Sequence, residues 1–364
     1  MFICRFPTIR KLFPLLLITF LIFNLCAPGT GFISPADPDI QYNGRIDFTD
    51  SEAPIFFWPG TSVTANFNGT SLKVALEDEK GDNYFNVFID GNDKDYYIID
   101  CAPGDSIYAV ATGLTDEQHS VMIFKRTEGV NGWTKFKGFH LNLGSSLSDA
   151  PPIPERRIEF YGNSITCGMG NEAPADSGDT IIAQKNNYMA YGAITARNLG
   201  AEYRCIARSG IGIMKSWFDL VMPDYYYRHD PANPESRWDF SVWTPDVLII
   251  NLMQNDSWLV DRIDPIPDDT QRADAYINFV RSLRIQYPDA SIFCVLGVMD
   301  AVREGAAWPG YIKSAVEKMR TEYDDDNVFA YIFEDQGFYK HPRVEHHKKM
   351  AEELTTVIRS KTGW

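Results

Sequence analysis

Basic residues are the scarce class of charged side chain in this sequence. The 364 residues include 34 Lys and Arg against 49 Asp and Glu, which gives a formal net charge of −15. Loss of a leader that contains Arg5, Arg10 and Lys11 removes three cations and takes this charge to −18. A field of this sign repels nucleic acid and anionic membrane surfaces, and it favours neutral polymers over polyuronates. We therefore expect no nucleic-acid partner.

Cysteine is also rare, and its placement does not indicate a metal centre. Two of the six cysteines fall in the leader region, and the other four are Cys101, Cys167, Cys205 and Cys294. Their spacing matches no zinc motif. Cys205 and Cys294 lie in apolar, strand-like runs, as buried free thiols do. We expect neither a metal nor an organic cofactor.

The main apolar stretch is too short to span a membrane comfortably. It runs from Leu12 to Leu25, follows a basic segment, and has the length of a signal-peptide core. We predict that residues 1–30 are a signal peptide and that the mature protein is exported, either secreted, periplasmic or associated with the cell envelope. Lipidation at Cys26 is the alternative, but Leu25 is bulkier than the residue that normally precedes such a cysteine.

Two sequence patterns predict two domains. In residues 37–147, short alternating runs such as Tyr84–Ile89 are separated by turn pairs such as Asn68-Gly69, which is typical of an all-β sandwich or jelly roll. Residues 148–157 are proline-rich and predict a short linker that holds the domains in a fixed orientation. In residues 158–364, strands alternate with helical stretches, which predicts a three-layer α/β domain with a parallel sheet.

The segment from Ile158 to Gly168 carries the most information about chemistry. An apolar run stops at Gly162, and Ser164 follows at the turn. Glycine lets the backbone leave a sheet sharply, and the next residues can open a helix whose free N–H groups face the serine oxygen. A nucleophilic serine is typically found at such a turn between a strand and a helix. Taken alone, the segment also fits an ordinary turn in which the serine caps a helix.

A second candidate lies near the C-terminus, where His341 precedes Pro342. Apolar residues then recur at helical spacing, which predicts a closing helix. His341 therefore lies in a loop immediately before a helix, from which an imidazole can reach another loop. His346 and His347 fall inside the helix and point to different faces, so we interpret them as solvated surface residues rather than metal ligands.

Two further segments end in polar residues or glycines. The run Val247–Ile250 predicts a strand buried on both faces, and Asn255 and Asp256 fall just past its end. We expect Asp256 to hold its loop by accepting backbone N–H groups. A strand near Tyr203 is likewise followed by a glycine pair at 210 and 212. In open α/β sheets, sites form at the carboxyl edge of the strands.

Together these segments resemble the Gly-Asx-Ser, Gly, Asn-Asp and His-Pro blocks of SGNH (GDSL-type) hydrolases. More narrowly, the chain resembles carbohydrate esterase family 2 (acetyl xylan esterase-like), whose members place a small β-sandwich before an SGNH catalytic domain. The resemblance covers nearly the whole mature chain, including Trp58-Pro-Gly60, residues 83–91, Lys125-Arg-Thr-Glu128 and residues 162–168. It implies a jelly-roll-like sandwich followed by a flavodoxin-like α/β domain.

The resemblance implies a role for each site residue. Ser164 would be the nucleophile and His341 the base that takes its proton. The backbone N–H of Ser164, the backbone N–H of Gly210 and the side-chain amide of Asn255 would bind the oxyanion. Gly210 is preferred because it follows Ser209 directly after the strand, and Gly212 is the alternative.

Three positions depart from the family pattern. Phe338 stands where many SGNH enzymes carry an aspartate that orients the histidine, Met253 replaces the glycine of the Gly-x-Asn-Asp block, and Lys340 replaces an aromatic residue. We therefore expect a backbone carbonyl to orient His341, with Asp335 as the alternative.

The activity that this implies is removal of O-acetyl groups from a neutral polysaccharide or oligosaccharide, such as acetylated xylan or glucomannan. Trp217, Trp258 and Trp308 are candidates for stacking on sugar rings, although packing in the interior explains each of them equally well. One alternative is a glycan-binding protein whose SGNH domain is weak or inactive. Another is an arylesterase or lysophospholipase-like hydrolase, but no apolar lid for a lipid is evident.

Overall fold

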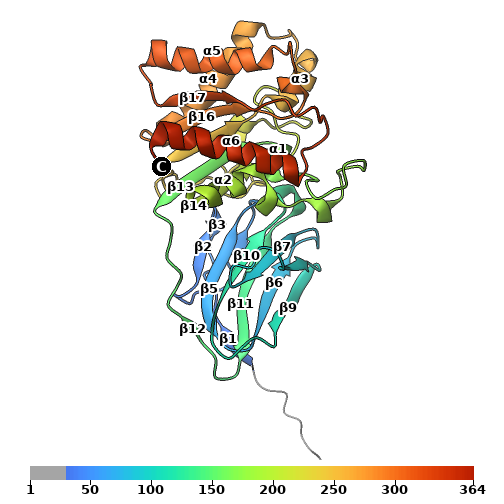
Figure 1. Ribbon diagram of the computed structural model, residues 1–364, viewed down its shortest axis with the longest axis vertical. Coiled ribbons are helices and arrows are strands. Elements are labelled where there is room, and N and C mark those ends of the chain that lie inside the picture. Colours follow the sequence, from blue (N-terminus) through green and yellow to red (C-terminus); the bar gives the residue numbers. More distant parts are fainter. Residues whose placement is uncertain (1–29) are drawn as a thin grey trace, which may run out of the picture.

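The computed structural model describes residues 30–364, and the expected signal peptide lies outside these residues except for Thr30. Two domains are stacked along the long axis of the molecule, with a β-sandwich at one end and an α/β domain at the other (Figure 1). In the part of the chain that the structure describes, no helix is both long enough and apolar enough to cross a membrane.

The sandwich consists of two six-stranded antiparallel sheets. One has the order β3-β4-β11-β6-β9 with β1 paired to β11, and the other has the order β12-β5-β10-β7-β8 with β2 paired to β5. The strands are β1 (Thr30–Ile33), β2 (Gln41–Asn43), β3 (Ile46–Asp47), β4 (Ile55–Phe56), β5 (Ser62–Asn68), β6 (Ser71–Asp78), β7 (Tyr84–Ile89), β8 (Tyr97–Asp100), β9 (Gly104–Thr112), β10 (Gln118–Lys125), β11 (Thr134–Asn142) and β12 (Leu147–Ser148). The sandwich therefore begins before residue 37, because β1 completes an edge of β11.

The second domain is a parallel five-stranded sheet with the order β14-β13-β15-β16-β17. Numbered within the domain this order is 2-1-3-4-5, the flavodoxin-like arrangement. Its strands are β13 (Arg156–Gly162), β14 (Ala201–Ala207), β15 (Val247–Asn251), β16 (Ser291–Leu296) and β17 (Val328–Ile332). The predicted fold class is confirmed for both domains.

Helices cover both faces of the parallel sheet, with α2 and α6 on one face and α4 and α5 on the other (Figure 1). The helices are α1 (Ser164–Cys167), α2 (Tyr191–Leu199), α3 (Gln254–Leu259), α4 (Asp269–Gln286), α5 (Trp308–Tyr323) and α6 (Val344–Thr362). Helix α4 starts at Asp269, where the Asp268 carboxylate and the Gln271 side chain form a capping box at 2.8 Å each.

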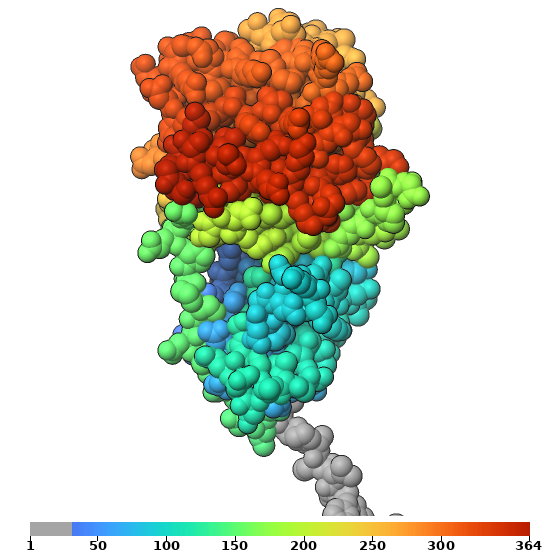
Figure 2. Space-filling view, in the orientation of Figure 1, coloured from blue at the N-terminus to red at the C-terminus, as the bar shows by residue number. Residues whose placement is uncertain are grey.

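Buried polar contacts join the two domains. Arg45 of the sandwich is fully buried, and its Nη2 donates to Glu159 of β13 at 3.1 Å. The indole of Trp58 donates to the carbonyl of His229 at 2.7 Å. At Gly60, a Cβ atom would lie 2.6 Å from the ring of Tyr203, so this approach requires glycine. The segment between β12 and β13 runs along one side of the interface between the two domains (Figure 2).

The placement of His347 differs from the sequence-based expectation. Its ring is fully buried between α6 and α2, where Nδ1 accepts the backbone N–H of Tyr191 at 3.1 Å and the ring stacks on that tyrosine. Helical spacing puts His347 on the same face as the apolar residues Met350, Leu354 and Ile358, which explains its burial. His346 is half-buried and accepts the N–H of Arg343 at 3.0 Å.

The burial of His347 predicts a pH-dependent loss of stability. Burial lowers its pKa from 6.5 to about 3, so the unfolded chain binds a proton that the folded chain does not bind between these values. The free energy of unfolding should therefore fall as pH drops below 6.5, by up to about 1.4 kcal/mol per pH unit. Urea unfolding of His347→Gln at several pH values should show a smaller slope.

His119→Gln provides the control for this measurement. Its hydrogen bond to Asp90 raises the pKa of His119, so the stability that it contributes is present at low pH and is lost as pH rises. The two variants should change the pH dependence in opposite directions. An unchanged acid slope in His347→Gln would contradict the assignment.

Candidate active site

Three adjacent strands bring the predicted site residues to one edge of the sheet. Strand β13 lies between β14 and β15, and Gly162 at its end is paired with Ala207 on one side and Asn251 on the other. Parallel strands end at the same edge, so the residues that follow them meet there. Ser164 follows β13, Gly210 follows β14, and Asn255 follows β15.

Ser164 is the first residue of α1, but it is not the residue that caps this helix. Asn163 is the cap, because its Oδ1 accepts the N–H of Ile165 at 3.0 Å. The Ser164 hydroxyl makes no hydrogen bond to another described residue, and neither does its backbone N–H. At Gly162 an added Cβ would lie 1.9 Å from the Thr166 hydroxyl, so only glycine permits the sharp turn. The capping interpretation of Ser164 is therefore wrong.

The choice between the two glycines after β14 depends on their N–H groups. The N–H of Gly212 donates to the Ser216 hydroxyl at 3.0 Å, so it is already used. The N–H of Gly210 has no acceptor among the described residues. Gly210 therefore has the free donor that an oxyanion site needs, which supports the preference for it over Gly212.

Asn255 has an orientation fixed by its neighbours. The indole N–H of Trp217 can only donate, so the atom that it contacts at 3.2 Å is the carbonyl oxygen of the amide. The amide nitrogen donates to the carbonyl of Ile211 at 2.8 Å. This bond uses one of its two N–H groups, and no described residue accepts the other.

Asp256 connects the loop after β14 to the start of α3 through hydrogen bonds. Its buried carboxylate accepts the backbone N–H groups of Ile213, Met214 and Lys215 at 3.0, 2.7 and 3.1 Å. Burial raises the pKa of Asp256, and the three N–H groups oppose this rise. The predicted structural role of Asp256 is confirmed. Met253, at the start of α3, has φ +80°, a conformation that favours glycine and is consistent with the family pattern at this position.

His341 is oriented by a carboxylate that the sequence did not reveal. Its Nδ1 lies 2.9 Å from Oδ2 of Asp179, and its backbone N–H donates to the same oxygen at 3.3 Å. Burial raises the pKa of Asp179, but the hydrogen bonds from the ring and backbone of His341, together with the charges of His341 and Arg343, outweigh burial and lower it, so the carboxylate is ionised and the ring donates. Nε2 of His341 has no hydrogen-bond partner among the described residues.

Both expected orienting groups were therefore wrong. A carboxylate, and not a backbone carbonyl, receives Nδ1–H. The exposed carboxylate of Asp335 instead accepts the N–H of Gly337 at 2.8 Å and the hydroxyl of Tyr339 at 3.0 Å. Phe338 stacks on His346, with ring centroids 4.6 Å apart, and leaves the usual aspartate position without a carboxylate.

The loop that carries Asp179 is held against the histidine loop. Nη2 of Arg343 donates to the carbonyls of Pro174 and Ser177 at 3.2 Å each, and its Nη1 donates to Gly170 at 3.0 Å. Lys340 donates to the carbonyl of Ser177 at 3.3 Å. The residue that departs from the family at 340 thus helps to fix the segment that supplies the carboxylate.

The three tryptophans have different environments. Trp217 is 54% exposed. Its indole binds Asn255, and its backbone N–H donates to the Gly210 carbonyl at 3.1 Å. Trp217 therefore contacts two of the residues that are proposed to bind the oxyanion. Trp258 is 39% exposed and donates to Asp300 at 2.8 Å. Trp308 is buried and packs edge-on against Tyr311, and it lines a cavity together with Trp258.

The arrangement has the parts of an acyl-transfer site, although the hydroxyl of Ser164 and the ring of His341 do not hydrogen bond to each other. Such bonds are often long before substrate binds. Sequence reasoning missed Asp179 because it lies 162 residues from His341. The only local signal was an acidic residue in the loop that follows the serine helix.

Comparison with known proteins shows which sequences and folds this chain resembles. The family model "Carbohydrate esterase 2 N-terminal" matches residues 42–151. The chain is 28% identical to an acetylxylan esterase / glucomannan deacetylase of Cellvibrio japonicus, covering 98% of the chain and 100% of that relative. It is 35% identical to the cellulase/esterase CelE of Acetivibrio thermocellus, covering 90% of the chain but only 40% of that longer protein.

A solved structure covers both domains. It is a family two carbohydrate esterase from Clostridium thermocellum in complex with cellohexaose, with 35% identity and a TM-score of 0.81 over 89% of this chain and 99% of that chain. Sequence identity, coverage and fold therefore agree, and the chain belongs to carbohydrate esterase family 2.

Proposed function

We propose that this protein is an exported serine esterase that removes O-acetyl groups from a neutral polysaccharide. The observation that carries the proposal is the contact of 2.9 Å between Nδ1 of His341 and the Asp179 carboxylate. This contact fixes the tautomer in which Nε2 is the basic nitrogen. Ser164 is the matching nucleophile, because no described residue competes for its hydroxyl.

The reaction then follows the logic of serine acyl transfer. Nε2 of His341 takes the proton as Ser164 Oγ attacks the acetyl carbonyl, and Asp179 stabilises the imidazolium. The N–H groups of Ser164, Gly210 and Asn255 stabilise the negative charge that develops on the carbonyl oxygen by donating hydrogen bonds to it. Collapse expels the sugar hydroxyl, which receives the proton from His341. Water, activated by the same nitrogen, then releases acetate.

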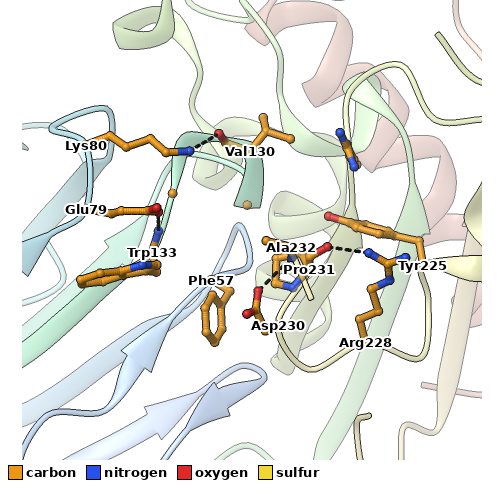
Figure 3. Close-up of a pocket in the computed structure, with 13 residues that line it drawn as sticks. Phe57, Glu79, Lys80, Val130, Trp133, Tyr225, Arg228, Asp230, Pro231 and Ala232 are labelled. Atoms are coloured by element: carbon orange, nitrogen blue, oxygen red, sulfur yellow. Dashed lines mark hydrogen bonds between the residues drawn. The ribbon is translucent and has the colours of Figure 1, made fainter. Parts of the chain in front are cut away.

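A cleft between the domains supports a polymeric substrate. It has a volume of about 590 Å³, and its lining includes Phe57 and Trp133 from the sandwich and Tyr225 and Arg228 from the α/β domain (Figure 3). Arg208, which also lines it, directly follows β14 and lies two residues before Gly210 in the sequence. Aromatic walls with a few polar groups are typical of ligand sites.

The names of the relatives support the substrate class. A relative that the chain covers over its whole length is an acetylxylan esterase / glucomannan deacetylase, and a related structure holds cellohexaose. A β-linked, acetylated plant polysaccharide is therefore the substrate that we propose. Export of the mature protein remains part of the same proposal, based on the leader pattern in residues 1–30.

We expect Ser164→Ala to abolish release of acetate from acetylated xylan and from an aryl acetate. The alanine deletes only the attacking oxygen, so activity should fall by roughly 10⁴-fold or more. The melting temperature should stay close to that of the wild type. Near-normal turnover by the variant would show that another group is the nucleophile, and polysaccharide binding by an inactive wild type would favour a binding protein instead.

Asp179→Asn tests the orienting carboxylate, with Asp335→Asn as its matched control. An amide at 179 can no longer stabilise the imidazolium or fix its tautomer, so kcat on an aryl acetate should drop by about 10²- to 10⁴-fold. Asp335→Asn, at an exposed position without contact to His341, should change kcat little. Equal effects of the two substitutions would refute the assignment of Asp179.

Trp133→Ala tests the cleft as a polymer subsite. Trp133 is half-buried and lines the cleft, and its backbone N–H donates to Glu79, another lining residue, at 3.2 Å. Loss of the ring should raise KM for an acetylated polymer about tenfold, equivalent to about 1.4 kcal/mol, with no change on an aryl acetate. Phe32→Ala removes an exposed ring on β1, a strand at the end of the sandwich away from the α/β domain (Figure 1), and should affect neither substrate.

A further inference from the structure

One carboxylate of the sandwich is enclosed by groups of the α/β domain. Glu128 lies between β10 and β11 and is only 1% exposed. Its Oε1 accepts from Lys185 Nζ at 2.9 Å and from the Ser209 hydroxyl at 2.6 Å, and its Oε2 accepts the Ser209 backbone N–H at 2.6 Å. The thiol of Cys167 lies 3.7 Å from the same Oε2.

Two of these partners belong to the segments that carry proposed oxyanion donors. Ser209 directly precedes Gly210, and Cys167 is the last residue of α1, which Ser164 begins. Because Glu128 binds both the N–H and the hydroxyl of Ser209, it fixes the backbone and the side chain of that residue together. The next N–H along the chain is the free donor of Gly210.

The charge of Glu128 is maintained within the protein. Burial raises its pKa, but Lys185 and the two bonds from Ser209 outweigh burial, and the pKa lies below its usual value. The segment of Lys185 is itself bound by the sandwich, since Nε of Arg126 donates to the Lys185 carbonyl at 3.0 Å. Charge-assisted bonds of this kind are short and hold their geometry strongly.

We propose that Glu128 is a positioning residue for the esterase reaction, through which the N-terminal sandwich sets the Gly210 N–H relative to Ser164. The inference rests on the proposed function and deepens it. The sandwich is then a part of the catalytic unit rather than a separable substrate-binding module. It is needed even for a small ester that never contacts the sandwich surface.

The experiment compares two double variants of the full mature chain. Glu128→Gln with Lys185→Met removes both charges of this ion pair, so that neither is left buried without its partner. The control, Arg45→Met with Glu159→Gln, removes the other fully buried interdomain ion pair, which has no contact with Ser209. Melting temperature, kcat and KM on an aryl acetate are measured for both.

We expect both double variants to lose melting temperature, but only the Glu128 variant to lose kcat. The expected loss is about 10²-fold, which is the effect of displacing a catalytic group by about 1 Å, with KM little changed. Equal kcat values in the two variants would overturn the inference and leave Glu128 as an interdomain ion pair. In that case Ser164→Ala would still be inactive, so the proposed function would stand.

A measurement without substrate separates the two proposals further. Amide hydrogen exchange over residues 209–212 should be faster in the Glu128 variant than in the wild type and in the Arg45 control, because the Ser209 N–H loses its charged acceptor. If the wild type has no esterase activity, the proposed function fails, and exchange alone decides whether Glu128 orders the loop. Unchanged exchange at these residues would refute the positioning role.

Discussion

Buried ion pairs between the two domains are the constraint on which the rest of the structure depends. Arg45 meets Glu159, Arg126 meets Glu172, and Lys185 meets Glu128, each with at least one partner that is wholly enclosed. Separation of the domains would leave charges in apolar surroundings without their partners, which is far more costly than loss of a surface pair. The orientation of the sandwich on the α/β domain is therefore fixed by charge, and not only by a short linker.

The site benefits from that rigidity because its parts come from distant segments. The strand order places Ser164, Gly210 and Asn255 at one edge of the sheet. Side chains then fix the positions of the donors. Trp217 contacts both Gly210 and Asn255, and Asp256 holds the backbone from Ile213 to Lys215. The histidine and its carboxylate are joined by Arg343 and Lys340 rather than by one helix or strand. Preorganised donors of this kind account for much of the catalytic power of such sites.

Local patterns in the sequence were sufficient for the fold and for the residues at strand ends. Alternation predicted β7 to the residue, and the apolar run before Gly162 predicted the turn at Ser164. Asp179 could not be predicted, because its contact with His341 depends on how two loops meet in space. His347 was misassigned because it was interpreted as a surface histidine, although its helical spacing to Met350, Leu354 and Ile358 places it on the buried face of α6. The role of Trp308 was left open because tertiary packing, which the sequence does not show, decides how far its ring is exposed.

Contacts that couple two domains also determine how the family can be recombined. Arg45, Arg126 and Glu128 belong to the sandwich, while Glu159, Glu172 and Lys185 belong to the α/β domain. A chimera that joins the sandwich of one family member to the α/β domain of another would be compatible only if the two parents carry complementary charges at each of these pairs. In this protein, new substrate preferences should therefore be more accessible through changes in the lining of the cleft than through exchange of the whole N-terminal domain.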